Sequence, residues 1–405
     1  MKPYLLLVFI FWPVFCQSAI RIPLKKFPTE HNRISSYKEH SKWKREEPGK
    51  NKLVHIYDPA TYGLVGVGTP IQFIPILFDT FSNEIWLFNN ECTSEICLIT
   101  KPYNPSSSNT SKIWRIEYKQ SYKNLNMYGQ YTVDTFLLGD FILDKLEFVN
   151  IRRIEWKGTV ERLSLETFAG QITLRFPAKT RGTDFMAKLF SRDLIEGKSF
   201  GLRLPSFNDG DGRGELIIGD WDRQYVNESL IDWIKVISDS YWEIIADKLV
   251  YGSYGLAEQA DMVVDTGLSI IVGPQVIVNN LFKSIGNSVN IIPITITSFL
   301  SDYDGYAAKC SESLSNFDFL INDRHYVLMP KDYLLPIEGK EGWCAFGIAM
   351  ANNNYTRSWR LGDVFLSKYY TVCDGNLSRL SFNDYLARNN QTRFSAGNFV
   401  SLLEI

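Results

Sequence analysis

The sequence predicts a mainly β protein that is built from two similar halves. Aromatic residues make up 14% of the chain (Trp 10, Tyr 21, Phe 26), and these residue types favour β-sheets. Short runs of β-branched and aromatic residues follow one another along the chain, and one Asp-Thr motif ends such a run in each half. Single hydrophobic cores stop growing near roughly 250–300 residues, so a chain of 405 residues is expected to form two lobes.

The overall composition excludes several classes of protein. Hydrophobic residues make up 45% and charged residues 22%, which is typical of a folded chain and excludes an intrinsically disordered one. The formal net charge of −2 gives no reason to expect a nucleic-acid partner. Four histidines and six cysteines leave little material for an enzyme with several metal ions, and no metal site is predicted.

The N-terminus is interpreted as a secretory signal peptide that spans residues 1–18. Lys2 precedes an apolar run that ends near Cys16, and the small residues Ser18 and Ala19 follow it. A membrane anchor is the alternative, but Leu5–Cys16 is shorter than the roughly 20 residues of a membrane span and is interrupted by Pro13. No later segment has 18 consecutive apolar residues, so no membrane span is expected after signal removal.

Residues 19–52 are predicted to form a basic, propeptide-like segment. Residues 20–52 contain ten basic and four acidic residues, an excess of six positive charges, whereas the chain from residue 53 onward carries a net charge of −9. Opposite charge favours docking of the segment on the acidic body. We expect it to cover the cleft near neutral pH and to leave on acidification; the alternative is a solvated linker.

Strand-like segments dominate from residue 53 onward. They are bounded by Gly, Pro, Asn or Asp and comprise Leu53–Tyr57, Tyr62–Val67, Ile71–Phe78, Ile85–Phe88, Ile113–Tyr118, Gln130–Leu138, Leu146–Trp156, Gln171–Phe176, Glu215–Gly219, Trp233–Ile237, Tyr241–Ile245, Met262–Val264, Phe317–Ile321 and Tyr326–Met329. The pattern favours helices only at Asp184–Ile195 and at Val276–Ile285, and the second follows a Gly-Pro start signal. The sequence therefore predicts few and short helices.

The cysteines and the glycosylation sequons fit an oxidising, secretory compartment. Cys92 and Cys97 close a short loop that suits a local disulfide, Cys310 and Cys344 are the candidates for a longer one, and Cys373 is left as a buried free thiol. There is no C-x-x-C pair that would indicate zinc or redox chemistry. The Asn-x-Ser/Thr sequons, which predict exposed glycosylation sites, are at Asn109, Asn227, Asn354, Asn376 and Asn390.

The two halves share a motif in which Asp-Thr ends an apolar strand. In the first half the strand runs into Asp79 and Thr80, and in the second half it runs into Asp265 and Thr266. Each motif alone would read as an ordinary turn, because Asp is a common turn residue. Two matched copies, separated by about the length of one lobe, indicate a duplicated structure with a shared function.

Further motifs accompany this pair in a fixed order. They are Ile22-Pro23-Leu24, Tyr62-Gly63, Gly66-Val67-Gly68-Thr69-Pro70, Cys92 and Cys97, Tyr241-Trp242-Glu243-Ile244, Gly362-Asp363-Val364-Phe365 and Tyr369-Tyr370-Thr371-Val372. With them, the chain resembles the pepsin and cathepsin D family of aspartic peptidases from about residue 20 to residue 383. The resemblance implies a bilobal double β-barrel fold with a central cleft, divided at residues 53–220 and 221–383, with a C-terminal tail at 384–405.

The resemblance also implies a reaction that two aspartates perform without a cofactor. Carboxyl groups held close together share one proton, because both cannot ionise cheaply. The ionised member takes a proton from a water that attacks the peptide carbonyl, and the protonated member hydrogen-bonds the carbonyl oxygen. Asp79 and Asp265 are the implied catalytic pair. Thr80, Ser82 and Thr266 are the implied supporting residues, and Gly267 is an implied substrate contact.

A tyrosine-bearing flap over the cleft is implied as well. Trp114-x-Ile116-x-Tyr118 matches the apolar, alternating strand of the flap and favours Tyr118, whereas counting back from Asp134-Thr135 favours Tyr122. Neither tyrosine is followed by the usual glycine. Trp86 matches the residue that contacts the flap tyrosine, and it also suits a place in the core.

Several departures from the family pattern lie around the catalytic loops. Phe81 replaces the glycine that should follow Asp79-Thr80, and the supporting stretch of the first lobe is Gln171-Ile172-Thr173 instead of two apolar residues and a glycine. Leu268 replaces a hydroxyl residue that would support Asp265, whereas Leu361-Gly362 follows the pattern. We expect Phe81→Gly to raise peptidase activity because it restores space and backbone freedom beside Asp79.

Two functional classes therefore remain open at the level of sequence. The first is a secreted or lysosome-like, monomeric aspartic endopeptidase that acts in acid on peptide or protein substrates. The second is a catalytically impaired homologue that binds peptides or proteins in its cleft. A β-sandwich lectin or adhesion module would leave the paired motifs unexplained.

Overall fold

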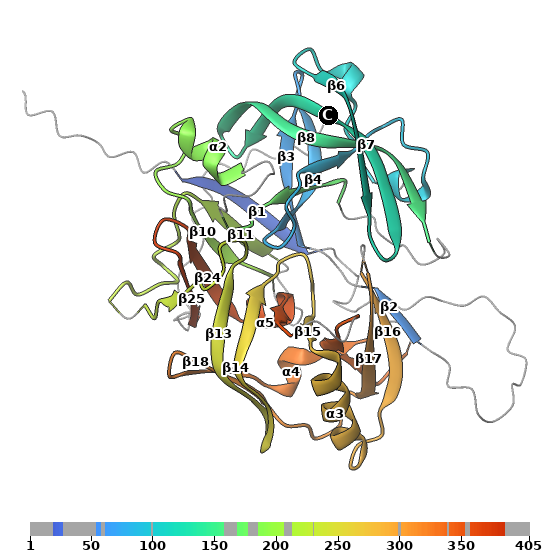
Figure 1. Cartoon of the computed structure of the whole chain (residues 1–405), viewed down its shortest axis with the longest axis vertical. Helices are drawn as coiled ribbons and strands as arrows, with labels where there is room; N and C mark the ends of the chain where they lie inside the picture. The colour runs from blue at the N-terminus through green and yellow to red at the C-terminus, as the bar shows by residue number, and fades with distance from the viewer. Residues whose placement is uncertain are drawn as a thin grey trace, which may run out of the picture.

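The structure is a computed structural model that describes residues 19–26, 54–57, 61–98, 100–157, 168–176, 185–205, 213–229, 231–298, 301–337, 340–352 and 357–384. Two large, curled β-sheets dominate it, with a few short helices between their strands (Figure 1). The upper lobe in Figure 1 is built mainly from the first half of the chain and the lower lobe from the second. The mainly β, two-lobed fold that the sequence predicts is confirmed.

The first sheet has thirteen strands within the described residues. In spatial order they are β12 (Ile234–Lys235), β25 (Arg379–Asp384), β24 (Tyr369–Asp374), β10 (Ser199–Arg203), β11 (Arg213–Ile218), β1 (Ile20–Lys26), β3 (Thr61–Val67), β4 (Gln72–Asp79), β9 (Gly170–Thr173), β5 (Trp86–Phe88), β8 (Phe141–Trp156), β7 (Leu125–Leu138) and β6 (Lys112–Ser121). β6 and β7 form the hairpin at the far edge of this sheet.

The second sheet has a main path of ten strands. In spatial order they are β19 (Arg324–Leu328), β18 (Phe317–Ile321), β13 (Glu243–Tyr251), β14 (Tyr254–Val264), β23 (Trp359–Leu361), β15 (Ile271–Gly273), β22 (Ile348–Met350), β17 (Asp302–Lys309), β16 (Ile292–Thr297) and β2 (Val54–Tyr57). Beside this path, β21 (Trp343–Phe346) pairs with β17 and with β20 (Leu334–Pro336).

The described helices are short, as the sequence predicts. They are α1 (Glu95–Leu98), the 3₁₀ turn η1 (Pro105–Ser107), α2 (Phe185–Ser191), α3 (Gln275–Gly286), α4 (Pro330–Tyr333) and α5 (Asp363–Leu366). The longest, α3, buries Val278, Leu281, Phe282 and Ile285. This spacing places all four on one face of a helix, which is why the sequence pattern locates α3 to within a residue at each end.

The helix expected at Asp184–Ile195 is shorter than the prediction. It ends at Ser191 because Asp193 adopts a left-handed conformation with φ of 54°. The amide N–H of Leu194 then donates to the carbonyl of Leu189 at 3.1 Å, which is the bond that closes a Schellman-type helix end. An aspartate tolerates this conformation better than most residues, but the apolar spacing alone does not reveal it.

Strand β1 is the described part of the predicted propeptide-like segment. It pairs with β11 on one side and with β3 on the other, and Ile20, Ile22 and Leu24 are buried in the core. Arg21 lies 3.1 Å from Glu215 and 3.4 Å from Asp222, so a basic side chain of the segment does meet acidic side chains of the body. The predicted covering of the cleft by residues 20–52 stays a prediction, because residues 27–52 lie outside the described residues, as do the signal peptide and the tail from residue 385 onward.

The first sheet contains strands from both ends of the chain. β24 and β25 come from the C-terminal 40 residues, yet β24 pairs with β10 and β25 pairs with β12 in the sheet that also holds β3 and β4. The lobes predicted at residues 53–220 and 221–383 therefore both contribute strands to this sheet. Among the described residues no helix is both long and apolar enough to span a membrane.

Candidate active site

The first Asp-Thr loop begins where β4 leaves the sheet. Asp79, the last residue of β4, is 4% exposed and lies opposite Thr173 on the parallel strand β9. Its Oδ1 accepts the backbone N–H of Phe81 at 2.7 Å and of Ser82 at 3.3 Å. Two donors from the following turn therefore hold the carboxylate at the end of the strand.

The second loop repeats this arrangement at the end of β14. Asp265 follows that strand directly, is fully buried, and donates its backbone N–H to the carbonyl of Leu361 at 3.0 Å. Its Oδ1 accepts the N–H of Gly267 at 3.0 Å. The duplicated motif of the sequence thus corresponds to two equivalent loops, one in each lobe.

The two threonines join these loops across the interface between the lobes. The backbone N–H of Thr80 donates to the hydroxyl of Thr266 at 3.1 Å, and the N–H of Thr266 donates to the hydroxyl of Thr80 at 3.1 Å. Each hydroxyl also donates to a carbonyl of the opposite strand, from Thr80 to Val264 at 2.8 Å and from Thr266 to Phe78 at 2.6 Å. Reciprocal bonding of this kind fixes the two aspartates relative to one another.

Gly267 shows how closely the loops approach. A Cβ atom at position 267 would lie 2.9 Å from the carboxyl carbon of Asp79, which is too near for any side chain. The glycine of the second loop is therefore required by the carboxylate of the first.

Comparison with known families fits this geometry. A family model described as "Eukaryotic aspartyl protease" matches residues 60–385, which is most of the chain. The chain belongs to this family. Gastricsin from Oryctolagus cuniculus is 29% identical over 333 residues, covering 80% of this chain and 81% of the relative.

Two further relatives have similar identities. Pepsin A from Bos taurus is 28% identical over 380 residues, covering 88% of this chain and 96% of the relative. Cathepsin D from Clupea harengus is 27% identical over 408 residues, covering 94% and 99%. The family membership expected from the sequence motifs is confirmed, and with it the general type of protein, an aspartic endopeptidase.

Arg360 is the main feature of the site that sequence reasoning missed. It lies on β23, and its Nε donates to Oδ2 of Asp265 at 2.5 Å, while a second guanidinium nitrogen contacts the same oxygen. The guanidinium also donates to the hydroxyl of Tyr303 at 3.2 Å. One of the two aspartates of this aspartyl protease is therefore bound in an ion pair with an arginine of its own chain.

A comparison of the two lobes would have found Arg360. Gln171 lies opposite Leu77 on the strand beside the first loop, and Arg360 lies opposite Val263 on the strand beside the second. The departure at Gln171 is visible in the sequence, and the equivalent position of the other half is the residue before Leu361. Because Leu361-Gly362 follows the family pattern, the stretch that contains Arg360 does not look altered in the sequence.

Burial has the largest effect on the acidity of Asp265. It raises the pKa of this carboxyl to about 6, the nearby Asp79 acts in the same direction, and Arg360 opposes the shift. The ion pair in turn raises the pKa of Arg360, against the effect of burial. The guanidinium therefore carries its charge at neutral and at acidic pH.

Phe81 lies in the cleft, between the arginine and a tyrosine. The guanidinium of Arg360 lies 4.2 Å from the centre of the Phe81 ring, the Phe81 ring stacks on Tyr241 with centres 4.9 Å apart, and the guanidinium of Arg175 lies 4.1 Å from the Tyr241 ring. We call Arg360, Phe81, Tyr241 and Arg175 the stacked row. The backbone of Phe81 does not have a positive φ, so this position does not require a glycine.

The other departures in the first lobe are compensated by hydrogen bonds. The side-chain amide of Gln171 donates to the hydroxyl of Ser82 at 2.5 Å and to the carbonyl of Glu84 at 3.2 Å. The hydroxyl of Thr173 donates to the carbonyl of Ser82 at 2.6 Å. Polar residues therefore support this loop where the family pattern uses packing, and Ser82 is the residue they hold.

The flap is the β6–β7 hairpin, and Tyr122 lies at its tip. The N–H of Tyr122 donates to the carbonyl of Leu125 at 2.8 Å to form the turn. Tyr122 lines the cleft, and burial raises its pKa to about 12, with Asp79 acting in the same direction. Tyr118 is buried behind it, with its ring edge-on to Tyr131 at 6.0 Å. Of the two candidates, Tyr122 therefore has the position over the cleft.

Trp86 lies in the core. It is 1% exposed, and its ring packs against Phe88 at 5.1 Å and Phe168 at 6.1 Å between centres. Phe168 in turn lines the cleft. The structure thus places Trp86 one layer behind the cleft wall.

The tip of the flap is hydrogen-bonded to the opposite lobe. The ammonium of Lys123 donates to the carbonyl of Asp302 at 3.1 Å and to Oδ1 of Asn352 at 2.9 Å. The amide of Asn124 donates to Oδ1 of Asp302 at 3.1 Å and to the carbonyl of Ser298 at 3.4 Å. We call these four bonds the tip contacts. They close the flap over the aspartates.

A cavity of about 590 Å³ remains beneath the flap. We call it the cleft cavity. Its walls include the carboxylates of Asp79 and Asp265, the buried side chain of Leu268, the stacked row and the tip residue Lys123. Of the predicted site residues, Asp79, Ser82, Tyr122, Asp265, Thr266 and Gly267 line this cavity, whereas Thr80, Trp86 and Tyr118 do not.

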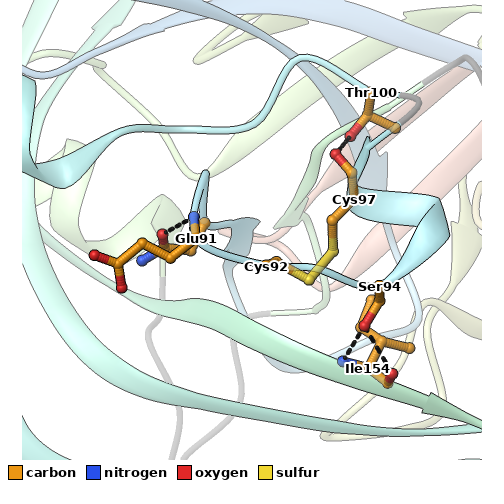
Figure 2. The surroundings of a disulfide bond; sticks show 7 residues. Glu91, Cys92, Ser94, Cys97, Thr100 and Ile154 are labelled. Carbon is orange, nitrogen blue, oxygen red and sulfur yellow. Dashed lines mark hydrogen bonds between the residues drawn. A yellow bond between two sulfur atoms is a disulfide. The ribbon is translucent and has the colours of Figure 1, made fainter.

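The disulfides and the described sequons lie away from this cavity. Cys92 is bonded to Cys97, and the loop between them is tied to β8 because Ser94 exchanges hydrogen bonds with the backbone of Ile154 (Figure 2). Cys310 is bonded to Cys344, and Cys373 is a free, buried thiol whose pKa is raised by burial. Asn109, Asn227 and Asn376 are exposed, while Asn354 and Asn390 lie outside the described residues.

Proposed function

We propose that this family member is catalytically impaired and uses its cleft to bind peptides or proteins. The single observation that carries this proposal is the ion pair between Arg360 and Asp265. We place the protein in the secretory pathway as a monomeric glycoprotein, secreted or lysosome-like. The signal-like N-terminus, the five sequons and the two disulfides support this location.

The ion pair conflicts with what the reaction needs from the two aspartates. Aspartic proteases are the standard example of two carboxyl groups that share one proton. Both oxygens of Asp265 are engaged, Oδ1 by the N–H of Gly267 and Oδ2 by Arg360. A permanently charged guanidinium on Oδ2 favours the ionised carboxylate and takes the place where a water or a substrate carbonyl would bind.

Two further features oppose access of a substrate. The tip contacts hold the flap against the other lobe, and the ring of Phe81 fills space between Arg360 and Tyr241. Binding of a peptide therefore requires the flap to open, and scission requires Arg360 to leave Asp265.

An acid-acting endopeptidase is the second candidate, and one observation favours it. Asp79, Asp265 and the reciprocal threonine bonds are all present, and the pKa of Asp265 is raised to about 6. Below that pH the protonated carboxyl holds Arg360 less strongly. The ionised Asp79 then takes a proton from a bound water that attacks the peptide carbonyl, and the protonated Asp265 donates to the carbonyl oxygen.

The purified chain distinguishes these candidates. It is incubated from pH 3 to pH 7 with a broad peptide library, with and without a transition-state-mimicking aspartic protease inhibitor, beside Asp79→Asn as the inactive control. The proposal expects no inhibitor-sensitive cleavage above the Asp79→Asn background at any pH. Cleavage that appears below about pH 6 and is lost in Asp79→Asn would instead establish the acid-acting endopeptidase.

A further inference from the structure

Arg175 is a second arginine of the cleft cavity that the catalytic reaction does not use. It follows strand β9 by two residues, is half-buried, and lines the same cavity as Arg360. Its charge therefore faces the space in which a peptide would lie.

The backbone that carries Arg175 is held from several sides. The N–H of Leu174 donates to the carbonyl of Asp79 at 2.7 Å, and the carbonyl of Leu174 accepts the indole N–H of Trp242 at 2.8 Å. The N–H of Arg175 itself donates to the hydroxyl of Thr173 at 3.1 Å. Its position is therefore fixed relative to the first aspartate.

The guanidinium is also oriented. Its plane lies over the ring of Tyr241, 4.1 Å from the ring centre, and its Nε donates to the carbonyl of Ser240 at 2.5 Å. A guanidinium carries five N–H donors, and within the described part of the chain these are the only contacts of its polar head. The terminal nitrogens remain available in a fixed fork.

Arg175 and Arg360 differ in whether their charge is paired. Arg360 is neutralised by Asp265, whereas Arg175 forms no ion pair with any described residue. Among the residues that the structure describes, Lys123, at the roof of the cavity, also donates only to uncharged oxygens, those of Asn352 and of the Asp302 carbonyl. The cavity therefore holds two cations that have no carboxylate partner within the described part of the chain.

We infer that Arg175 recognises a carboxylate of a peptide bound in the cleft cavity, either an acidic side chain or a free C-terminus. An oriented guanidinium is the group that best matches a carboxylate, because two parallel N–H···O bonds form at once. Lys123 adds favourable charge from above. This inference rests on the proposed cleft-binding function and names the class of ligand.

A purely structural role for Arg175 is the alternative. Its bond to Ser240 and its contact with Tyr241 connect β9 to the segment before β13, so its removal lowers stability in either case. A structural role does not, however, change the ratio of affinities for an acidic and a neutral peptide. That ratio is the quantity to measure.

The experiment uses fluorescence polarisation at neutral pH with labelled octapeptides. A neutral parent peptide is compared with variants in which each Gln in turn is replaced by Glu, and with C-terminally amidated and free forms. The proteins are the wild type, Arg175→Gln, Arg175→Lys and the matched surface control Arg192→Gln, each also in a Lys123→Ala/Asn124→Ala background that frees the flap. Thermal melting shows that each variant is folded.

The expected result is that one acidic peptide, or the free C-terminus, binds the wild type about tenfold more tightly than its neutral match. The ratio falls to about one in Arg175→Gln, is partly kept in Arg175→Lys and is unchanged in Arg192→Gln. Equal affinities for acidic and neutral peptides, a preference that survives Arg175→Gln, or no binding in either flap background overturns the inference. Inhibitor-sensitive cleavage of the same peptides refutes the catalytic impairment alone, because the affinity ratio is read separately.

Discussion

The two Asp-Thr loops are built alike and have diverged in different ways. In the first lobe, Gln171 and Thr173 turn their polar groups toward Ser82 and support the loop. In the second lobe, the equivalent polar residue, Arg360, turns toward the carboxylate itself. The same change from an apolar to a polar residue thus stabilises the loop in the first lobe. In the second lobe it places a charged group on the catalytic carboxylate.

The comparison shows that the number of departures from a family pattern does not locate the functional change. The first lobe has three unusual residues, Phe81 in the loop and Gln171 and Thr173 on the supporting strand β9, and Asp79 still accepts two backbone N–H groups. The second loop keeps Gly267 and Leu361-Gly362, and its aspartate is nevertheless bound by an arginine. What matters is where a side chain points relative to the carboxylate.

Replacement of each of the two equivalent residues, Arg360 and Gln171, by Ile tests this comparison most directly. We expect Arg360→Ile to raise kcat/KM for a fluorogenic peptide at pH 4 by about 100-fold, since a single misplaced electrostatic contact in a catalytic site has an effect of that order. Gln171→Ile should leave activity at the wild-type level and lower the melting temperature instead, because the bond to Ser82 is lost.

Arg360→Lys is the control for charge, and it should stay as inactive as the wild type. Removing one partner of a buried ion pair lowers stability by roughly 3–5 kcal/mol, so folding of Arg360→Ile is checked by circular dichroism. A greater gain in kcat/KM from Gln171→Ile than from Arg360→Ile would mean that the first loop, and not the second, limits activity.

The pH dependence of stability gives a second test of the Asp265 loop. The folded-state pKa of Asp265, about 6, lies above its ordinary value of 3.8, so its protonation stabilises the fold below about pH 4 and this contribution is lost as pH rises through about 6. Relative to Asp265→Asn, the wild type should therefore lose on the order of 3 kcal/mol between pH 4 and pH 7. Urea unfolding at several pH values measures the difference, and parallel curves for the two proteins would contradict it.

Phe81→Gly tests whether the first loop limits activity only after Arg360 has been removed from the second. In the Arg360→Ile background we expect a further gain in kcat/KM of about tenfold, because the ring no longer crowds the substrate. In the wild-type background the sequence alone predicts a gain in activity, but with Asp265 bound by Arg360 we expect the same change to have no measurable effect on activity. An equal gain in both backgrounds would show that the loops limit activity independently.

The tip contacts should have the smallest effect. Lys123→Ala combined with Asn124→Ala should speed amide exchange of residues 121–125 at least about fivefold, since each lost hydrogen bond is worth about 1 kcal/mol. Lys119→Ala, on the same hairpin but over the ring of Tyr128, is the matched control. Unchanged exchange in the double variant would mean that other contacts hold the flap closed.

Periodic and duplicated features are the part of this protein that the sequence predicts well. The apolar spacing of Val278, Leu281, Phe282 and Ile285 locates α3, and the repeated Asp-Thr motif locates both loops. The end of α2 escapes prediction because it depends on the conformation of Asp193. Tyr118 and Tyr122 stay unresolved in the sequence, because only the turn at Tyr122 decides which of them reaches the cleft.

Arg360 escapes prediction for a different reason. Its consequence depends on a contact with Asp265, 95 residues earlier in the chain, and on the direction of a long side chain that local patterns do not encode. Comparison of the two halves position by position supplies the only signal, because Gln171 already marks that position as altered.

The shared sheet has a consequence for the order of events during synthesis. The N-terminal half cannot complete its sheet on the ribosome, because β10 lacks its neighbour β24 until residues 369–374 have been translated. Strand β1 likewise waits for β11, nearly 200 residues later. Pairings between distant segments form slowly and leave strand edges open in the meantime. The nascent first lobe therefore emerges with an unpaired strand edge, which closes only after residues 369–374 have left the exit tunnel.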